Sequence, residues 1–409
     1  MRWPIARGRM SHTIRQEFAD LFFATITPIH HKETIQKYEL VIAELLKSPN
    51  VRVFPFARTA FFAILKSLQL PPGSEIIMPS ITIKPFLDLA LHFNLSPIFV
   101  DLDPKTGVWE TSELENSLTE KTRVALLTYL FGVVPQVDEI IKILKKHNVL
   151  VVEDFSHSFG SAFRDQKIGT FGDFGICSTS STKSFDTYGG GVLIINNKNY
   201  LSPISKIYES LGAAKRYNLL KKIVRNLSLN IASNSFIFGI LTFPVIKLKN
   251  RSKKFQVGKY TGDRNLDPIT ELPKIWLHGF SSFQARIGMR ELRNLNTKDT
   301  RRRNIAEKYT AELNLQGPRG TVEGYSTYWQ YISIEEKATK FRKYFNENQI
   351  DCATTSLINL TKMPAYNINL NLKHTDDIYF KGVYLPCYHQ LTNSQQDRII
   401  STIKSYYGA

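Results

Sequence analysis

Cysteine is scarce in this chain of 409 residues. Its three cysteines, Cys177, Cys352 and Cys387, are scattered without the close spacing of a metal site. We therefore expect free thiols, a reducing compartment and no bound metal. The basic first ten residues are not followed by an apolar region with a small-residue cleavage site, so we expect no secretory signal.

Acidic residues are also few, because 36 Asp and Glu stand against 53 Lys and Arg and leave a formal net charge of +17. This charge favours an anionic partner, which can be a nucleic acid, an acidic membrane surface or a phosphorylated substrate. No acidic residue occurs between Glu209 and Asp263, and basic residues gather at both ends of that interval. They are Lys215, Arg216, Lys221, Lys222 and Arg225 before an uncharged segment, and Lys247, Lys249, Arg251, Lys253, Lys254 and Lys259 after it.

The uncharged segment, residues 226–246, contains the apolar run 236–244. A membrane-spanning helix needs about 20 mostly apolar residues, and the asparagines and serines of residues 226–235 argue against one here. Apolar residues bordered by lysine and arginine fit a segment in a membrane interface, so we predict that residues 215–259 bind an anionic membrane surface. The alternative is an insertion whose apolar part is buried at a subunit contact.

The length predicts a large α/β domain and a smaller one. We expect an N-terminal helical segment at 1–50, a large domain at 51–200, the basic apolar insertion at 201–275, and a long helix with a small domain at 276–409. Alternating apolar runs and helical patterns predict a mainly parallel sheet covered on both faces. Predicted strands outside the central stretch are 75–78, 97–100, 124–128 and 328–334, and predicted helices are 61–68, 137–146 and 336–346.

The N-terminal 50 residues show apolar residues at helical spacing, through Phe18, Leu21 and Phe22 and again through residues 38–46. We expect these helices to pack their apolar residues over a domain edge.

Two acid–base groups follow predicted strand ends in the stretch 149–196. The apolar run 149–152 ends in Glu153 and Asp154, and Lys183 follows the run 174–178 and a turn of small polar residues. Functional sites in open α/β sheets collect at the carboxyl ends of strands. A lysine there can form a Schiff base with the aldehyde of pyridoxal phosphate (PLP), and a carboxylate can keep the pyridine nitrogen protonated. The alternative is a solvated loop lysine and a helix-capping aspartate.

The same stretch resembles the core of the DegT/DnrJ/EryC1/StrS family of PLP-dependent sugar aminotransferases. The family pattern is Glu-Asp-x-x-Gln/His, then Gly-x-Phe-Gly-Asp, then a serine five residues before the Schiff-base lysine, then Gly-Gly. The matching residues are Glu153, Asp154, His157, Gly169 to Asp173, Ser178, Lys183, Gly190 and Gly191. With the segments after Trp276 included, the resemblance covers most of residues 51–197 and 276–407. It implies PLP-dependent transferase fold type I, like aspartate aminotransferase, with a mainly parallel central sheet and a smaller C-terminal α/β domain.

The resemblance also assigns roles to individual residues. Lys183 and Asp154 would be the catalytic residues and would hold the cofactor. Ser178 would bind the cofactor, and His157 would lie near a cofactor oxygen; the alternative for His157 is an ordinary core or capping histidine.

The chain keeps Thr59 of the family pattern but departs from the pattern at other positions around the cofactor. Residues 57–60 stand where the family has Ser-Gly-Thr-Ala before a helix, so Thr59 would lie near the cofactor phosphate and Arg58 would add a charge-assisted contact to it or point to solvent. Ile83 stands in place of the family's aromatic residue and would cover the cofactor ring without stacking. Leu277 and Gly279 replace the Asn and Arg of the usual cross-subunit phosphate contact, which Arg58 or a lysine of the insertion would then have to supply.

The function implied is amino transfer from an amino acid, L-glutamate by family analogy, to a keto-sugar that is nucleotide-linked or lipid-linked. The resemblance also implies a homodimer with the site at the subunit interface. We expect a cytoplasmic enzyme, peripheral on the inner face of the membrane if the insertion binds lipid. Three alternatives stay open: a sugar dehydratase of the family, in which histidine replaces the lysine; a non-catalytic relative; and, last, a nucleic-acid-binding protein, for which no recognition motif is present.

Overall fold

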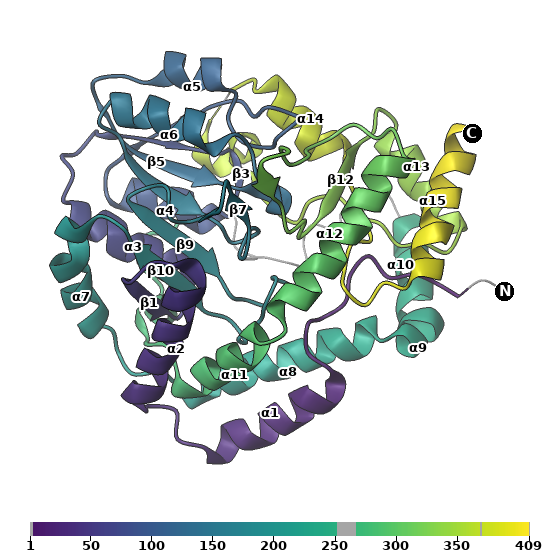
Figure 1. Ribbon diagram of the computed structural model, residues 1–409, viewed down its shortest axis with the longest axis horizontal. Coiled ribbons are helices and arrows are strands. Elements are labelled where there is room, and N and C mark those ends of the chain that lie inside the picture. Colours follow the sequence, from purple (N-terminus) through teal and green to yellow (C-terminus); the bar gives the residue numbers. More distant parts are fainter. Residues whose placement is uncertain (1–2, 252–266, 369, 409) are drawn as a thin grey trace.

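The computed structural model describes residues 3–251, 267–368 and 370–408. Figure 1 shows a large helix-covered sheet on one side and a smaller group of helices and strands on the other, which the long helix α12 (Leu295–Glu312) approaches from below. The basic residues Lys253, Lys254 and Lys259 of the predicted membrane segment lie outside the described residues.

The central sheet has seven strands and is mainly parallel. Its strands, in spatial order, are β1 (Val51–Phe54), β10 (Gly191–Ile195), β9 (Phe174–Ser178), β6 (Leu150–Asp154), β5 (Thr122–Thr128), β2 (Glu75–Met78) and β4 (Ser96–Phe99). The pairs β9–β6, β6–β5, β5–β2 and β2–β4 are parallel, whereas β10 runs antiparallel to both of its neighbours. The predicted α/β class with a mainly parallel central sheet is confirmed.

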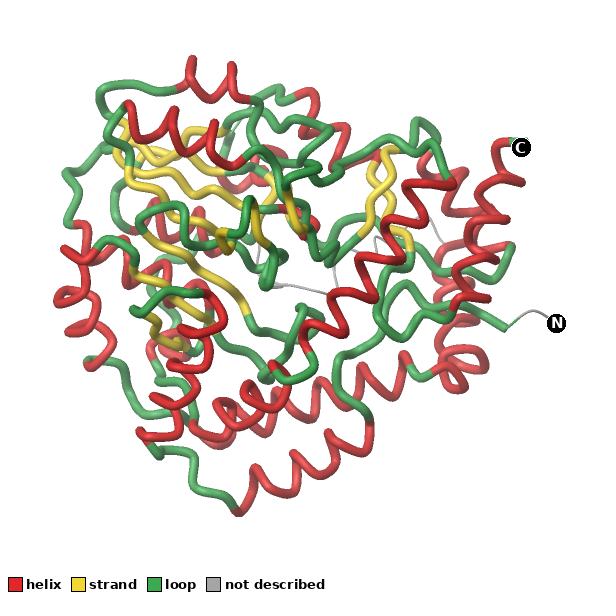
Figure 2. Tube along the Cα trace, viewed as in Figure 1, coloured by secondary structure: helices red, strands yellow, loops and turns green. Residues whose placement is uncertain are grey.

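Helices cover both faces of this sheet, as Figure 2 shows for the red helices around the yellow strands. Neighbouring strand residues point to opposite faces, so Val151 joins one buried cluster and Val152 the other. The first cluster receives α2 (Lys32–Leu46), α5 (Thr111–Ser117), α6 (Val137–Lys146) and α11 (Ser282–Leu292). The second receives α3 (Ala57–Leu68), α4 (Lys84–His92) and α7 (Leu201–Glu209). Strands buried on both faces explain why the sequence shows continuous apolar runs there.

The C-terminal part has its own apolar core. It contains β12 (Tyr331–Ile334) paired antiparallel with β14 (Gly382–Leu385), and the helices α13 (Ala338–Glu347), α14 (Lys373–Lys381) and α15 (Asn393–Tyr407). Short pairings complete the chain: β7 (Ala162–Phe163) with β8 (Gln166–Lys167) and β11 (Gly324–Tyr325), and β3 (Ile81–Thr82) with β13 (Ile358–Asn359). The predicted strand 328–334 starts only at Tyr331, because Tyr328 has φ of 47° and cannot continue a strand.

The described part of the insertion is helical. It forms α8 (Arg216–Ser233), α9 (Ser235–Ile237), the π-helical turn η3 (Phe238–Thr242) and α10 (Phe243–Arg251). Within the described residues no single helix is both long and apolar enough to cross a membrane; α8 and the segment Ser235–Leu248 pass that test only as a pair bent by 59°.

Helix α1 (Ile14–Ile26) is turned the opposite way from our expectation. Phe18, Phe22 and Ile26 are 55%, 60% and 62% exposed, whereas Glu17 and Asp20 are buried. The helix was predicted correctly, but the prediction that Phe18 and Phe22 pack inward is wrong. The carboxylates face inward because α8 and the helix α11 supply polar partners for them.

Candidate active site

Lys183 and Asp154 lie at the same edge of the sheet, as predicted. Strands β6 and β9 are adjacent and parallel, so their carboxyl ends meet there. Asp154 is the last residue of β6, and Lys183 follows β9 after a turn in which its amide donates to the Ser180 carbonyl at 3.1 Å. The turn contains Thr182 with φ of 77°, a left-handed conformation that turns the chain back toward the sheet.

Serine side chains hold the Asp154 carboxylate in place. Its Oδ1 accepts hydrogen bonds from the amide of Ser156 at 3.1 Å and from the Ser156 hydroxyl at 2.5 Å. The same hydroxyl oxygen accepts from the amide of Ser178 at 2.9 Å and so ties Asp154 to the end of β9. Oδ2 receives no side-chain or backbone donor among the described residues, so it is available to a ligand. Burial raises the pKa of Asp154, although Ser156 and the charge of Lys183 act against this effect.

The Lys183 amine is partly withdrawn from water. Burial lowers its pKa to about 8, against the attraction of Asp154. This pKa raises the neutral fraction of the amine to about a tenth at pH 7, and a neutral amine is the form that attacks a carbonyl carbon or accepts a proton.

His157 is buried and neutral. Its Nδ1 accepts a hydrogen bond from the amide of Phe131 at 3.2 Å, which leaves the proton on Nε2. Burial, together with the nearby charge of Lys183, lowers the pKa of His157 well below its ordinary value. The ring therefore presents an N–H donor, the property that a contact with a cofactor oxygen requires.

An aromatic residue that the sequence did not single out lies beside this group. The indole of Trp329 stacks on His157 with ring centroids 4.0 Å apart, and the Lys183 Nζ lies 4.1 Å from the centroid of a Trp329 ring. Trp329 Nε1 donates to the Thr182 carbonyl at 2.5 Å and so connects the lysine turn to the C-terminal part. The one sequence signal was an aromatic residue at the entrance of a predicted strand, which pointed to packing rather than to the site.

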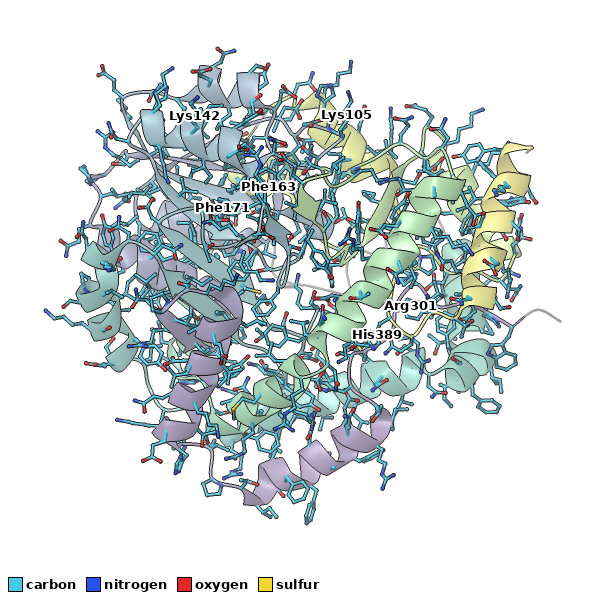
Figure 3. All side chains as sticks on the ribbon, viewed as in Figure 1. Lys105, Lys142, Phe163, Phe171, Arg301 and His389 are labelled. Carbon is cyan, nitrogen blue, oxygen red and sulfur yellow. The ribbon has the colours of Figure 1, made fainter. Side chains whose placement is uncertain are left out.

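Glu153 and the Gly-x-Phe-Gly-Asp motif support the site without entering it. The buried Glu153 carboxylate accepts from the Tyr129 hydroxyl at 2.6 Å and from the amides of Gly169, Phe171 and Gly172 at 2.9, 2.6 and 2.7 Å. Phe171 packs on Phe163 with centroids 6.3 Å apart, in front of the sheet in Figure 3. These contacts fix the turn that leads into β9.

The predicted phosphate residues lie at the N-terminus of α3, on the same edge of the sheet. Gly191 begins β10 there, and a Cβ on it would come within 2.4 Å of the Phe56 carbonyl carbon, so only glycine lets α3 approach. Ser178 is the pairing partner of Gly191, which places it beside this helix end. The Thr59 hydroxyl donates to the Trp276 carbonyl at 2.8 Å, so its single hydrogen is already engaged. The Arg58 guanidinium lies 5.3 Å from the centroid of the Phe56 ring.

Three other predicted positions contribute less. Ile83 is the N-cap residue of α4 and packs, partly buried, against the apolar cluster under α3. Leu277 and Gly279 form backbone hydrogen bonds with Gly212. Neither residue has a side chain with a cation or an amide that could bind a phosphate.

The insertion helix α8 supports the lysine turn directly. Asn226 is fully buried; its amide donates to the Asp186 carboxylate and its carbonyl accepts from the Ser181 hydroxyl. Ser181 and Asp186 lie on either side of Lys183. One side chain of the insertion therefore clamps both ends of the segment that carries the lysine.

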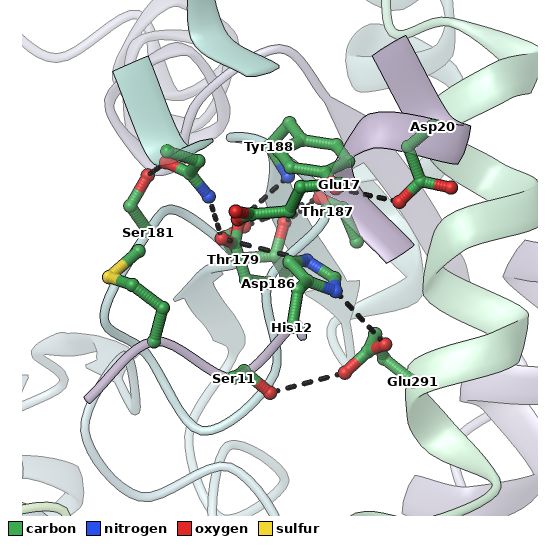
Figure 4. A network of polar contacts seen from close by, with 12 residues as sticks. Ser11, His12, Glu17, Asp20, Thr179, Ser181, Asp186, Thr187, Tyr188 and Glu291 are labelled. Atoms are coloured by element: carbon green, nitrogen blue, oxygen red, sulfur yellow. Dashed lines mark hydrogen bonds and ion pairs between the residues drawn. The ribbon is translucent and has the colours of Figure 1, made fainter. Parts of the chain in front are cut away.

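The N-terminal segment closes the same network, which Figure 4 shows. His12 lies 3.7 Å from Asp186 and 3.2 Å from Glu291, and the Tyr188 hydroxyl donates to Asp20 at 2.6 Å. Burial lowers the pKa of His12, but the hydrogen bond to Glu291 and the charge of Asp186 prevail and raise it. A cationic His12 between two carboxylates fixes the N-terminal segment, the lysine turn and α11 to one another.

Sequence comparison assigns the chain to a known group. The sequence model of the DegT/DnrJ/EryC1/StrS aminotransferase family matches residues 20–234 and 279–404. The match is wider than the resemblance found by inspection, because it includes α2 and all of α8, so the internal segment without a match is residues 235–278. The GDP-perosamine synthase of Escherichia coli O157:H7 is 23% identical over 381 residues, which cover 91% of this chain and 90% of that protein.

Solved structures show the same fold. The sugar aminotransferase CalS13 from Micromonospora echinospora superposes with a TM-score of 0.72 at 18% identity, covering 99% of this chain and 100% of that one. Spr1654 from Streptococcus pneumoniae, solved in a PMP form and a PLP form, gives TM-scores of 0.71 and 0.70 at 18% identity, and each comparison covers 99% of this chain and 98% of that one.

Proposed function

The chain belongs to the DegT/DnrJ/EryC1/StrS aminotransferase family, whose enzymes depend on PLP, and on this premise we propose that it transfers an amino group from an amino acid to a keto-sugar. L-Glutamate is the proposed donor, and the keto-sugar is nucleotide-linked or lipid-linked. The observation that carries the proposal is the pair formed by Lys183 and Asp154 at the carboxyl edge of the sheet, with the amine made less basic by burial.

The residues present fit PLP. The free Oδ2 of Asp154 can accept a hydrogen bond from a protonated pyridine nitrogen, and the Nε2–H of His157 can donate to a ring oxygen. Ser178, with its hydroxyl 3.0 Å from that of Ser180, and the N-terminus of α3 lie where a phosphate would be bound. When bound, PLP supplies an electron sink that stabilises negative charge on the substrate carbon.

The chain's own groups would then divide the work. Asp154 keeps a proton on the ring nitrogen. The neutral Lys183 amine would remove the proton from the donor's α-carbon and deliver it to the cofactor carbon. In the second half-reaction it would move a proton in the opposite direction. Trp329 and His157 cover the amine on one side and keep water away from it.

The test is product identification. Purified protein, PLP and L-glutamate are incubated with nucleotide-linked and lipid-linked keto-sugars, and mass spectrometry detects a ketone converted to an amine together with 2-oxoglutarate. Lys183→Ala should abolish both products. A sugar product that has lost an oxygen atom and gained no nitrogen would instead support the dehydratase alternative, and a pure protein that binds no PLP would support a non-catalytic relative.

We further propose that the enzyme binds an anionic membrane surface through α1 and the insertion, from the cytoplasmic side. Helices α1 and α8 lie side by side at the lower edge of Figure 1. Large apolar side chains project from α1 and from the later part of the insertion, namely Phe18, Phe22, Phe23 and Ile26 of α1 and Phe236, Ile240, Leu241, Val245 and Leu248 of the insertion, each 48–65% exposed. Lys221 and Arg225 are exposed on α8. Apolar residues among cations are the composition of an interfacial segment.

Flotation with vesicles of phosphatidylcholine, with and without phosphatidylglycerol, tests this proposal. Phe22→Ser/Phe23→Ser and Phe236→Ser/Leu241→Ser should reduce flotation with anionic vesicles, whereas Phe380→Ser, an equally exposed phenylalanine on α14, should not. Phe238 and Phe243 are unsuitable because they are buried against each other. If no variant changes flotation but the α1 variant shifts the oligomeric state, the surface is a subunit contact of the proposed homodimer.

A further inference from the structure

Two cations flank one aromatic ring at the N-terminus of α3. The Lys222 Nζ of α8 lies 4.3 Å from the centroid of the Phe56 ring, and the Arg58 guanidinium carbon lies 5.3 Å from the same centroid. Phe56 is the residue that caps this end of α3. The first amides of a helix attract an anion, so both cations add to a positive potential that the backbone already creates.

Lys222 reaches this place across the glycine turn that precedes β10. A Cβ on Gly189 would come within 2.9 Å of the Lys222 Nζ, so the glycine makes room for the amine. Gly191, two residues later, packs on the Ala57 amide and pairs with Ser178. The amine, the helix end and the serine therefore surround one small region at the edge of the sheet, with the PLP-binding residues described above.

Burying the charged Lys222 amine costs free energy. Burial, together with the charge of Arg58, lowers the pKa of Lys222 to about 8, and the attraction of Asp186 opposes this only in part. No ion pair or hydrogen bond to the Lys222 amine is present among the residues that the structure describes. An anionic ligand beside the Lys222 amine would offset the cost of burying its charge.

The residues that the family resemblance assigns to the PLP phosphate are missing in this chain. Leu277 and Gly279 occupy the positions at which the family resemblance places cross-subunit phosphate ligands, and neither side chain carries a donor. The Thr59 hydroxyl is turned away to the Trp276 carbonyl. We propose that Lys222, assisted by Arg58, binds the phosphate of PLP from within the same chain and replaces the residues that the partner subunit supplies elsewhere in the family. This inference rests on the family's cofactor and not on the sugar substrate proposed above.

Equilibrium binding of PLP and of pyridoxal to cofactor-depleted protein tests the proposal, because pyridoxal has the ring and aldehyde but no phosphate. Lys222→Met should weaken PLP binding by about 10- to 100-fold, the range expected for one charge-assisted hydrogen bond, and leave pyridoxal binding within about twofold. Lys222→Arg should restore most of the PLP affinity. Lys221→Met removes an exposed lysine one position earlier on α8 and should change neither constant.

The PLP dissociation constant should also stay the same when the protein is diluted until monomers dominate, because no ligand comes from a partner. An unchanged PLP affinity in Lys222→Met, an equal loss for pyridoxal, or PLP affinity that disappears on dilution would each overturn the proposal. None of these results bears on amino transfer itself, since the wild-type protein is assayed for turnover separately.

Discussion

Replacing Lys183 by methionine should stabilise the cofactor-free protein at neutral pH. The fall in the Lys183 pKa from 10.5 to about 8 corresponds to about 3 kcal/mol of lost stability while the amine is protonated in both the folded and the unfolded state. Methionine has a similar length and no charge to desolvate. Its introduction also removes the attraction on Asp154, so we expect a net gain of about 1–3 kcal/mol at pH 7.

The pH dependence identifies the cause. A lysine with a depressed folded pKa lowers stability fully below about pH 8, and this penalty disappears as pH rises from about 8 to 10.5, because the folded amine loses its proton first. The advantage of Lys183→Met should therefore be present at pH 7 and nearly absent at pH 10.5.

Urea unfolding of PLP-free wild type and variant at the two pH values, followed by tryptophan fluorescence and circular dichroism, measures the difference. Lys121→Met, at an exposed lysine, is the matched control and should leave the free energy of unfolding unchanged at both. A variant less stable than wild type at pH 7, or a gain of the same size at pH 10.5, would show that burial of the amine is not what lowers stability at this site.

Three further predictions concern the residues around the lysine turn. Glu153→Gln should lower the free energy of unfolding by about 2–4 kcal/mol in urea titrations, because a side-chain NH₂ would face the Gly169 amide and charge-assisted bonds would be lost; a cost below about 1 kcal/mol would indicate a protonated carboxyl. Trp329→Phe should retain most transaminase activity and Trp329→Ala should lose about tenfold or more, since the ring and not the Nε1–H covers the amine; equal losses would assign the effect to the hydrogen bond with Thr182. Gly191→Ala should yield little folded protein by size-exclusion chromatography, because its Cβ overlaps the backbone of Phe56, whereas Gly212→Ala, whose Cβ would make only ordinary van der Waals contacts, should fold normally.

The sequence predicts those site residues whose position depends only on a strand and the turn that follows it. Asp154 and Lys183 could be placed because an apolar run followed by a polar residue marks the carboxyl end of a buried strand, and parallel neighbours bring such ends together. The motif around Glu153 was recognised in the same way, although only the structure shows that its role is to fix the turn.

Residues that approach from distant segments could not be placed. Trp329 and Lys222 reach the site through tertiary packing, and no local spacing in the sequence specifies which neighbour they contact. Helix α1 illustrates the same limit. The spacing of its apolar residues predicted a helix but not which side faces inward. Glu17 and Asp20 face inward because they bind side chains of α8 and α11, about 200 residues or more away in the sequence, and Phe18 and Phe22 therefore face outward.

The contacts of His12, Asn226 and Glu291 that support the lysine turn also bear on when the site can form during translation. His12 leaves the ribosome first and the Lys183 turn much later, but Asn226 and Glu291, which the turn and His12 need, come later still. A nascent chain that ends before α11 already contains every residue that we expect to touch PLP, but it lacks Glu291, which pairs with His12, and Trp329, which donates to the Thr182 carbonyl. We therefore expect fragments that end before α11 to bind the cofactor more weakly than the full chain.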